Sequence, residues 1–297
     1  MPIDHPHPSG ELADEAARSS PDRLSPDRSP MAAAERGGDP VGSLHRAVQL
    51  MRAVAHGRAA GASLKDLVTA TLLPRPTIHR VTQMLIDVGW LERDRDNRRF
   101  YLGREIHGFG LVAALRHPIE RLAAAELARL AHETGQTIYM LARAGDDTVC
   151  VARHESTARI QTLVLQVGSR EPLGIGAGSM ALLAALPPQE AEQAFTRNLA
   201  RYRRHERFDE PSFRRALAEA RGRGFASHDG LFIRGVSGIG VAVRDESGYP
   251  LAALSTAFVT DWLDGTQRES LARRMETGAA AIAGSLLSAR AGAPDKG

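Results

Sequence analysis

The stretch from Ser63 to Val88 restricts the fold of this chain more than any other part of the sequence. Ser63 and Asp66 have the spacing of a capping box, in which both side chains bind first-turn N–H groups of a helix. Pro74 and Pro76 then interrupt the pattern, because proline lacks an N–H and disfavours helix in the residue before it. Pro76 suits the first turn of a following helix. The stretch therefore predicts two helices joined by a sharp turn.

The second predicted helix has an apolar face and a polar face. Its apolar side chains recur at spacings of three and four, at Ile78, Val81, Leu85 and Val88. Its polar face suits DNA, because arginine pairs with guanine, glutamine with adenine, and hydroxyl groups with either. The residues expected to contact the groove and phosphates are Arg75, Thr77, His79, Arg80 and Gln83, and Thr82 is expected on the same face. Taken alone, an ordinary solvated surface helix explains this pattern equally well.

The distribution of charge favours DNA binding. The net charge is only +3, but residues 41–104 hold eleven Arg or Lys against five Asp or Glu. Residues 1–40 hold four against eight, and residues 105–297 hold twenty-three against twenty-two. A surplus of positive charge on one segment is the electrostatic signature of a duplex-binding module.

Two short apolar runs around a charged turn follow at residues 89–103 and predict a β-hairpin. A further helix is predicted over residues 43–56, before the two-helix stretch. Three helices followed by a basic hairpin predict a winged helix-turn-helix. The wing side chains expected to reach the DNA backbone or minor groove are Arg95, Arg98 and Arg99.

The ends and the cysteine content give further expectations. Residues 1–40 are rich in Pro, Ser, Ala and charge, which predicts a disordered tail. Met31 is a candidate translation start, and N-terminal mass spectrometry of the native protein would test it. The one cysteine, Cys150, excludes an internal disulfide and favours a cytoplasmic location. No apolar run reaches the roughly 18 residues of a membrane span, so no membrane partner is expected.

The pattern changes after a predicted linker helix at residues 105–117. The apolar face of this helix packs either on a second subunit or on its own chain, and the sequence leaves both open. Helices are predicted at 118–135, 189–203, 211–221 and 267–290, and residues 170–186 are predicted to pass from a glycine-rich loop into a short apolar helix. Strands are predicted at 136–144, 148–155, 160–168, 224–230, 235–245 and 249–259. Strands joined by hairpin-like turns and interspersed with helices indicate an antiparallel α+β domain.

The chain resembles the IclR family of bacterial transcription regulators. The resemblance is carried by SLHRAVQLMRAV, LKDLVTATLLPRPTIHRVTQML and GWLERDRDNRRFYLG, and by residues 172–178 and 234–239. It covers residues 41–290. It implies an α+β protein: a winged helix-turn-helix at 41–104, a linker helix at 105–117, and a GAF/profilin-like antiparallel sheet flanked by helices at 118–290. The family's usual Gly-Leu-Pro reads Leu72-Leu73-Pro74 here, so the turn must form without glycine, and Pro76 replaces a usual serine.

The resemblance also implies an effector pocket between the sheet and the glycine-rich loop. Matched position by position, the effector-binding residues are Ala177, Gly178, Asp229, Ser237 and Gly238. Glycines let backbone N–H groups approach an anion, and the following helix N-terminus adds a favourable dipole. The expected effector is a carboxylic or aromatic acid. In the alternative interpretation, the glycine run is only a tight turn that packs a helix on a strand.

Together these features predict a homodimeric or homotetrameric regulator that binds a double-stranded DNA operator and responds to a small-molecule effector. No cofactor, metal ligand or catalytic residue is expected. Two alternatives stay open: a C-terminal domain that only oligomerises, and a cytosolic enzyme with an ancillary winged helix. The enzyme alternative lacks a motif, because Ser179 breaks the dinucleotide-binding glycine pattern and no G-x-S-x-G or metal-ligand spacing occurs.

Overall fold

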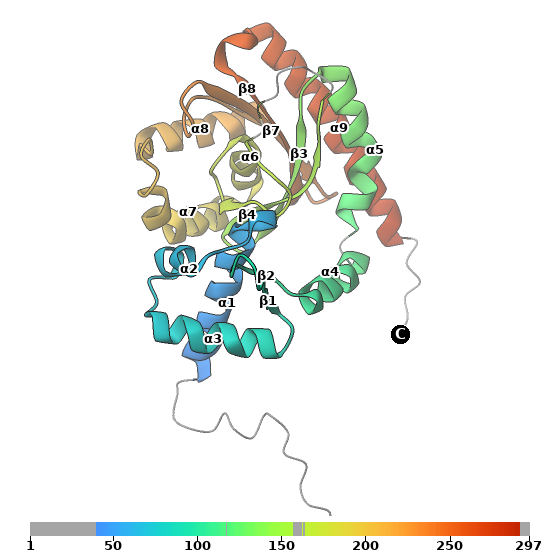
Figure 1. Ribbon diagram of the computed structural model, residues 1–297. Helices are drawn as coiled ribbons and strands as arrows, with labels where there is room; N and C mark the ends of the chain where they lie inside the picture. Colours follow the sequence, from blue (N-terminus) through green and yellow to red (C-terminus); the bar gives the residue numbers. More distant parts are fainter. Residues whose placement is uncertain (1–39, 117, 157–161, 163, 292–297) are drawn as a thin grey trace, which may run out of the picture.

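The computed structural model describes residues 40–116, 118–156, 162 and 164–291 (Figure 1). The tail predicted at residues 1–40, with Met31, lies outside this part except for Pro40, which begins the first helix. Within the described residues, no helix has both the length and the hydrophobicity needed to cross a bilayer.

The N-terminal part is a winged helix-turn-helix, as predicted. Its elements are α1 (Pro40–His56), a short 3-10 turn η2 (Arg58–Ala60), α2 (Leu64–Thr71), α3 (Arg75–Asp87), β1 (Leu91–Arg93) and β2 (Phe100–Leu102). The two strands pair antiparallel, with Leu91 opposite Leu102. Leu50, Leu67 and Ile78 are fully buried between the three helices. Each helix thus contributes one apolar face to a common core.

The turn between α2 and α3 forms much as the sequence indicates. The Asp66 N–H donates to Ser63 Oγ at 3.2 Å, and the Ser63 N–H donates to Asp66 Oδ2 at 2.8 Å, which confirms the capping box. Pro76 lies in the first turn of α3. Two expectations for the faces of α3 are wrong. Thr82 is buried because it lies one turn after the core residue Ile78 on the same face of the helix, where its hydroxyl donates to the Ile78 carbonyl at 2.7 Å. Val88 is exposed because α3 ends before it.

Leu72 shows how the turn is made without glycine. It caps α2 in the left-handed conformation, with φ 57° and ψ 16°, and its N–H donates to the Val68 carbonyl at 2.9 Å. Its side chain is 83% exposed, so it gains little from burial. Residues with a Cβ are strained in this conformation, whereas glycine adopts it freely.

We expect Leu72→Gly to raise the free energy of unfolding of the winged domain by about 0.5–1 kcal/mol, because relief of strain exceeds the added entropy of the unfolded chain. Leu72→Ala is the matched control, since it removes the same exposed side chain but keeps the Cβ. Urea denaturation followed by circular dichroism compares the two. A glycine variant no more stable than the alanine variant would contradict the expectation.

In the described part of the C-terminal domain, six strands form one antiparallel sheet in the order β5-β4-β3-β8-β7-β6. They are β3 (Ile138–Ala144), β4 (Asp147–His154), β5 (Arg170–Pro172), β6 (Phe225–Asp229), β7 (Val236–Arg244) and β8 (Pro250–Val259). The strand predicted at 160–168 is wrong in its described part. There, the Val164 N–H donates to the Tyr139 hydroxyl and the Gln166 N–H to Ser169 Oγ, so residues 164–168 form a loop instead.

Helices cover both faces of the sheet (Figure 1). On one face lie α5 (Ile119–Thr134) and α9 (Gly265–Ala291), and on the other lie α6 (Ala177–Ala185), α7 (Pro188–Tyr202) and α8 (Glu210–Arg223). The start of α6 packs very closely on β7. A Cβ placed on Gly240 would overlap the carbonyl group of Ala177 and lie 2.5 Å from the Gly178 nitrogen. Glycine at position 240 is therefore what allows α6 to approach the sheet.

Helix α4 (Arg104–Arg116) connects the two domains and, within the described chain, buries none of its side chains. Its apolar side chains are exposed, with Phe109 at 53%, Val112 at 68% and Leu115 at 83%. One ring contact joins it to the winged domain, where Trp90 meets Phe109 edge to face at 6.0 Å. Burial of this face against its own chain, one of the two arrangements allowed by the sequence, is not what the structure shows.

Candidate nucleic-acid interface and ligand pocket

Most of the side chains on the polar face of α3 are exposed. The side chains of Arg75, His79 and Arg80 are exposed and have no hydrogen-bond or ion-pair partner among the residues described. Thr77 is half-buried, and Gln83 is exposed and donates through Nε2 to Asp87 Oδ1 at 2.8 Å. Helix α3 lies on the side of the winged domain away from the large sheet (Figure 1). This face is therefore open to a partner.

The three wing arginines divide into two kinds. Arg95 and Arg98 are exposed on the turn between β1 and β2. Arg99 is half-buried, and its Nη1 donates to the Gly61 carbonyl at 2.9 Å and lies 3.9 Å from Asp66 Oδ2. Arg99 thus holds the wing against the start of α2, whereas the other two point to solvent. The sequence carried no signal of this difference, because all three lie in one charged turn.

A cavity of about 170 Å³ lies between the start of α6, strands β7 and β8, and the loops around them. Four of the five residues predicted to bind an effector line it, namely Ala177, Gly178, Ser237 and Gly238. Apolar walls come mainly from Leu141, Val164, Leu165, Ile175, Phe232 and Ile233. The structure therefore brings residues 177–178 and 237–238 together around one cavity.

Asp229, the fifth predicted residue, does not line this cavity. It lies at the end of β6, and its Oδ1 accepts from Ser237 Oγ at 2.7 Å and from Arg268 Nη1 at 2.5 Å. It thereby fixes the Ser237 hydroxyl and ties β6 to α9. Its contact with the cavity is indirect, through Ser237.

The glycine-rich loop combines packing with an opening to the cavity. Gly178 is within α6, its N–H donates to Ser255 Oγ at 3.1 Å, and an added Cβ would lie 2.6 Å from Ser255 Cβ. Ser179 is buried and its Oγ accepts from the Gly174 N–H at 2.7 Å, which fixes the loop. Gly178 thus allows α6 to pack closely on β8, as in the alternative interpretation of the glycine run as a packing turn. Gly176, with φ 83°, caps α6 and lines the cavity.

His228 lines the cavity and was not among the predicted site residues. Both ring nitrogens are buried and have no hydrogen-bond partner in the described part of the chain. The ring meets Phe232 edge to face at 5.2 Å. Burial lowers the pKa of His228 to about 4, so its imidazole is uncharged near neutral pH. Neighbours on a strand point to opposite faces, and here His228 faces the cavity while Asp229 faces away.

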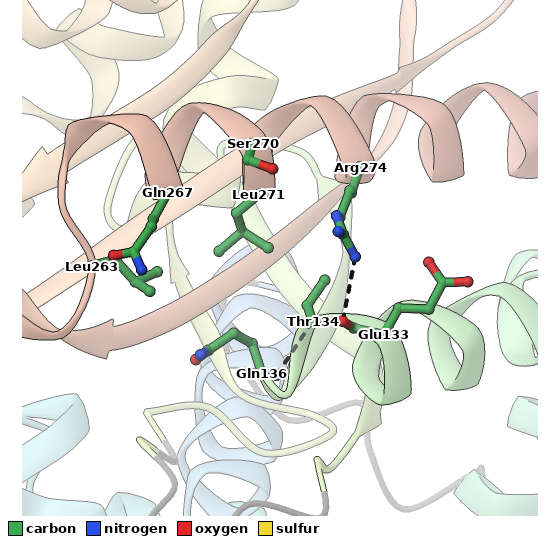
Figure 2. Close-up of a pocket in the computed structure, with 8 residues that line it drawn as sticks. All are labelled: Glu133, Thr134, Gln136, Leu263, Gln267, Ser270, Leu271 and Arg274. Carbon is green, nitrogen blue, oxygen red and sulfur yellow. Dashed lines mark hydrogen bonds between the residues drawn. The ribbon is translucent and has the colours of Figure 1, made fainter.

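A second hollow of about 220 Å³ lies on the other helical layer, between the end of α5 and the start of α9 (Figure 2). Its polar wall includes Gln136, Gln267 and Arg274, and Arg274 Nη1 donates to the Glu133 carbonyl at 3.4 Å. None of the predicted site residues lies in it. In the described chain, no cluster of three or more His, Cys, Asp or Glu is arranged to hold a metal ion.

A winged helix-turn-helix joined by a helix to a sheet domain with an internal cavity defines a class of ligand-responsive transcription regulators. The family model for the IclR C-terminal domain of bacterial transcriptional regulators matches residues 112–284, and that for the IclR helix-turn-helix domain matches residues 43–95. The chain belongs to the IclR family, and this favours a regulator over an enzyme.

Sequence identity to three curated relatives is between 24% and 30%. The chain is 30% identical to the HTH-type transcriptional regulator KipR of Bacillus subtilis over 44% of its own length and 51% of the relative. It is 27% identical to TsaQ1/TsaQ2 of Comamonas testosteroni over 54% of its length and 57% of the relative. The match thus spans about half the length of these curated relatives. With the glycerol operon regulatory protein of Streptomyces coelicolor, identity is 24% over 84% of this chain and 98% of the relative.

Solved structures share the fold. An IclR transcriptional regulator from Alicyclobacillus acidocaldarius superposes with a TM-score of 0.67 and 22% identity, over 83% of this chain and 99% of the other. An IclR homologue from Microbacterium hydrocarbonoxydans, complexed with 4-hydroxybenzoate, superposes with a TM-score of 0.64 and 20% identity, over 83% and 99%. At these identities the likeness concerns the fold alone.

Proposed function

We propose that this protein is a cytoplasmic transcription regulator that binds operator DNA through residues 41–104 and an effector through residues 118–290. The observation that carries the proposal is the polar face of α3, where Arg75, His79 and Arg80 are exposed and uncommitted. These residues, with Thr77 and Gln83, are assigned to the major groove and its phosphates. Arg95 and Arg98 are assigned to the backbone or minor groove, and Arg99 supports the wing.

The cavity is the proposed effector site, and the proposed effector is a carboxylic or aromatic acid. A cavity of about 150 Å³ lined by apolar side chains holds one benzene molecule. The cavity here, at about 170 Å³, therefore suits one aromatic ring or an aliphatic acid of similar size. The relative complexed with 4-hydroxybenzoate supports this choice of class.

A second copy of the chain is the proposed partner of α4. A helix with Phe109, Val112 and Leu115 exposed leaves an apolar face in water, and pairing with its equivalent would remove that face from solvent. Two copies also place two recognition helices on one duplex. Such helices read a palindrome when they lie about 34 Å apart. The effector would act by its different affinity for two arrangements of the pair.

Gel-shift titration of the protein against the DNA upstream of its own gene tests the proposal. We expect a discrete complex that survives competitor DNA. Its affinity should fall steeply between about 50 and 200 mM salt, because the arginines that neutralise DNA phosphates displace counterions from the duplex. Binding that competitor abolishes would reject a specific operator. Sedimentation of the free protein tests pairing, and a monomer at micromolar concentration would contradict it.

The remaining alternatives give different results. A C-terminal domain that only oligomerises would show no thermal shift with any small acid, although operator binding would be intact. An enzyme with an ancillary winged helix would turn over a substrate. Turnover would then be lost on replacing either of two residues at strand ends, His154 of β4 or Asp229 of β6.

A further inference from the structure

An acid effector would bring a negative charge into a cavity whose described lining has neither Arg nor Lys, and Glu171 contributes a carboxylate to that lining. A buried charge is costly unless it is paired. The start of α6 contributes a partial positive charge, but the Gly178 N–H already donates to Ser255 Oγ. Binding of an acid therefore needs a further source of positive charge.

His228 is placed to supply it. The residue pairs with Gly238 across β6 and β7, and its Nε2 lies 3.6 Å from the position of a Cβ built on Gly238. Because position 238 carries no side chain, no Cβ stands between the imidazole and Gly238, and both ring nitrogens are shielded from solvent. Both ring nitrogens lack a partner within the described residues. A neutral imidazole offers one donor and one acceptor, and a protonated one offers two donors and a positive charge.

We infer that an acid effector enters this cavity together with one proton, which His228 holds as an imidazolium paired with the effector carboxylate. The inference rests on the proposed function, in that it takes this cavity as the effector site. The acid arrives ionised, a proton from solvent is added to the second ring nitrogen of His228, and no covalent bond of the effector changes. The occupied cavity gains no net charge.

The surroundings of His228 agree with this exchange. Its low pKa, caused by burial, leaves the ring uncharged before the effector binds, so the proton must come from solvent. Asp229 favours the imidazolium but is itself bound to Arg268. His228 also lines a neighbouring hollow of about 480 Å³, formed mainly by residues of α8, β6 and the start of α9. Besides Asp229 and Arg268, the ionisable groups that line the two spaces are Glu171 and His205 in the cavity, and Arg215, Glu219, Arg223 and Glu269 in the hollow.

Calorimetric titration of the full chain with benzoate tests the inference. Heats measured at pH 6 in two buffers of different ionisation enthalpy give the number of protons taken up. We expect close to one proton per site. Because the free imidazole is neutral and the bound one charged, affinity should rise as pH falls, by up to about tenfold for each unit between pH 7 and pH 5. Benzoate stays ionised over this range, since carboxyl groups titrate near about pH 4.

Matched ligands and variants isolate His228. Benzamide has nearly the same shape as benzoate but no charge, so its affinity should not change with pH. His228→Gln keeps a hydrogen-bonding amide but cannot take up a proton in this range. It should abolish proton uptake and weaken benzoate at least about tenfold at pH 6, with benzamide affected less. His205→Gln, at the other cavity histidine, should leave proton uptake unchanged.

Three results would overturn the inference: benzoate binding without proton uptake, uptake that persists in His228→Gln, or no benzoate binding by protein that shifts operator DNA. Retention of benzamide binding by His228→Gln would show that the cavity of the variant is folded. Failure of the wild type to bind its operator would count against the proposed function instead.

Discussion

Arg80→Ala is expected to weaken operator binding by about thirtyfold or more at physiological salt. The Arg80 side chain is exposed on α3 and has no partner in the described chain, so its guanidinium is available for a base edge or phosphate. A good bidentate contact to a base contributes about 1–3 kcal/mol. In a paired regulator each substitution removes two such contacts, one from each half-site. Gel-shift titration at fixed salt measures the change.

Arg273→Ala is the matched control, because it removes the same charge from an exposed position on α9, outside the proposed interface. Its effect should be less than about threefold, as expected for distant charge at physiological ionic strength. Equal affinities for the two variants would remove Arg80 from the interface. If Arg80 contacts only phosphate, its loss should also reduce the salt dependence and weaken binding to all sequences alike.

Gly240→Ala is expected to lower the free energy of unfolding of the C-terminal domain by about 3 kcal/mol or more. The new methyl group would overlap the backbone of Ala177 and Gly178 at the start of α6. Overpacking of a buried site typically costs about 1–3 kcal/mol, and backbone atoms can yield less than a flexible side chain. Displacement of α6 would also deform the cavity, so ligand binding should be lost with stability.

Gly284→Ala is the control for this variant. Gly284 lies in α9 with no atom within 4 Å of an added Cβ, so alanine there should stabilise the helix by about 0.5–1 kcal/mol. Urea denaturation followed by circular dichroism measures both variants. A loss below about 1 kcal/mol in Gly240→Ala would mean that α6 can shift easily relative to the sheet.

The elements predicted correctly from the sequence are those set by local chemistry. The capping box at Ser63 and the proline in the first turn of α3 each act within a few residues, and so does Gly135, which ends the helix predicted over 118–135. Fold class followed from such signals and from the family resemblance. The strand expected at 160–168 depended on a partner strand, and in the described part of the segment the N–H groups at 164 and 166 bind side-chain oxygens instead.

The grouping of residues around the cavity was predictable in part. Residues 177–178 and 237–238 were matched by backbone position to a related family, and the structure places them around one cavity, while their role in effector binding stays a prediction. The sequence did not show which of His228 and Asp229 lines the cavity, because alternation along a strand indicates only that the two side chains face opposite ways. Likewise, the bonds that turn Arg99 toward Gly61 join segments 38 residues apart, and no local pattern reports them.

Helix α4 meets the base of the wing through Phe109 and Trp90, while its apolar side chains at Val112 and Leu115 remain open. The same 13 residues would thus determine both how the wing is oriented and how two chains meet. Substitutions on α3 would change the operator that is recognised, and substitutions at the cavity would change the effector. The two sets of substitutions can occur almost independently. Substitutions in α4 are constrained twice, because each one alters the geometry that any operator or metabolite must work through.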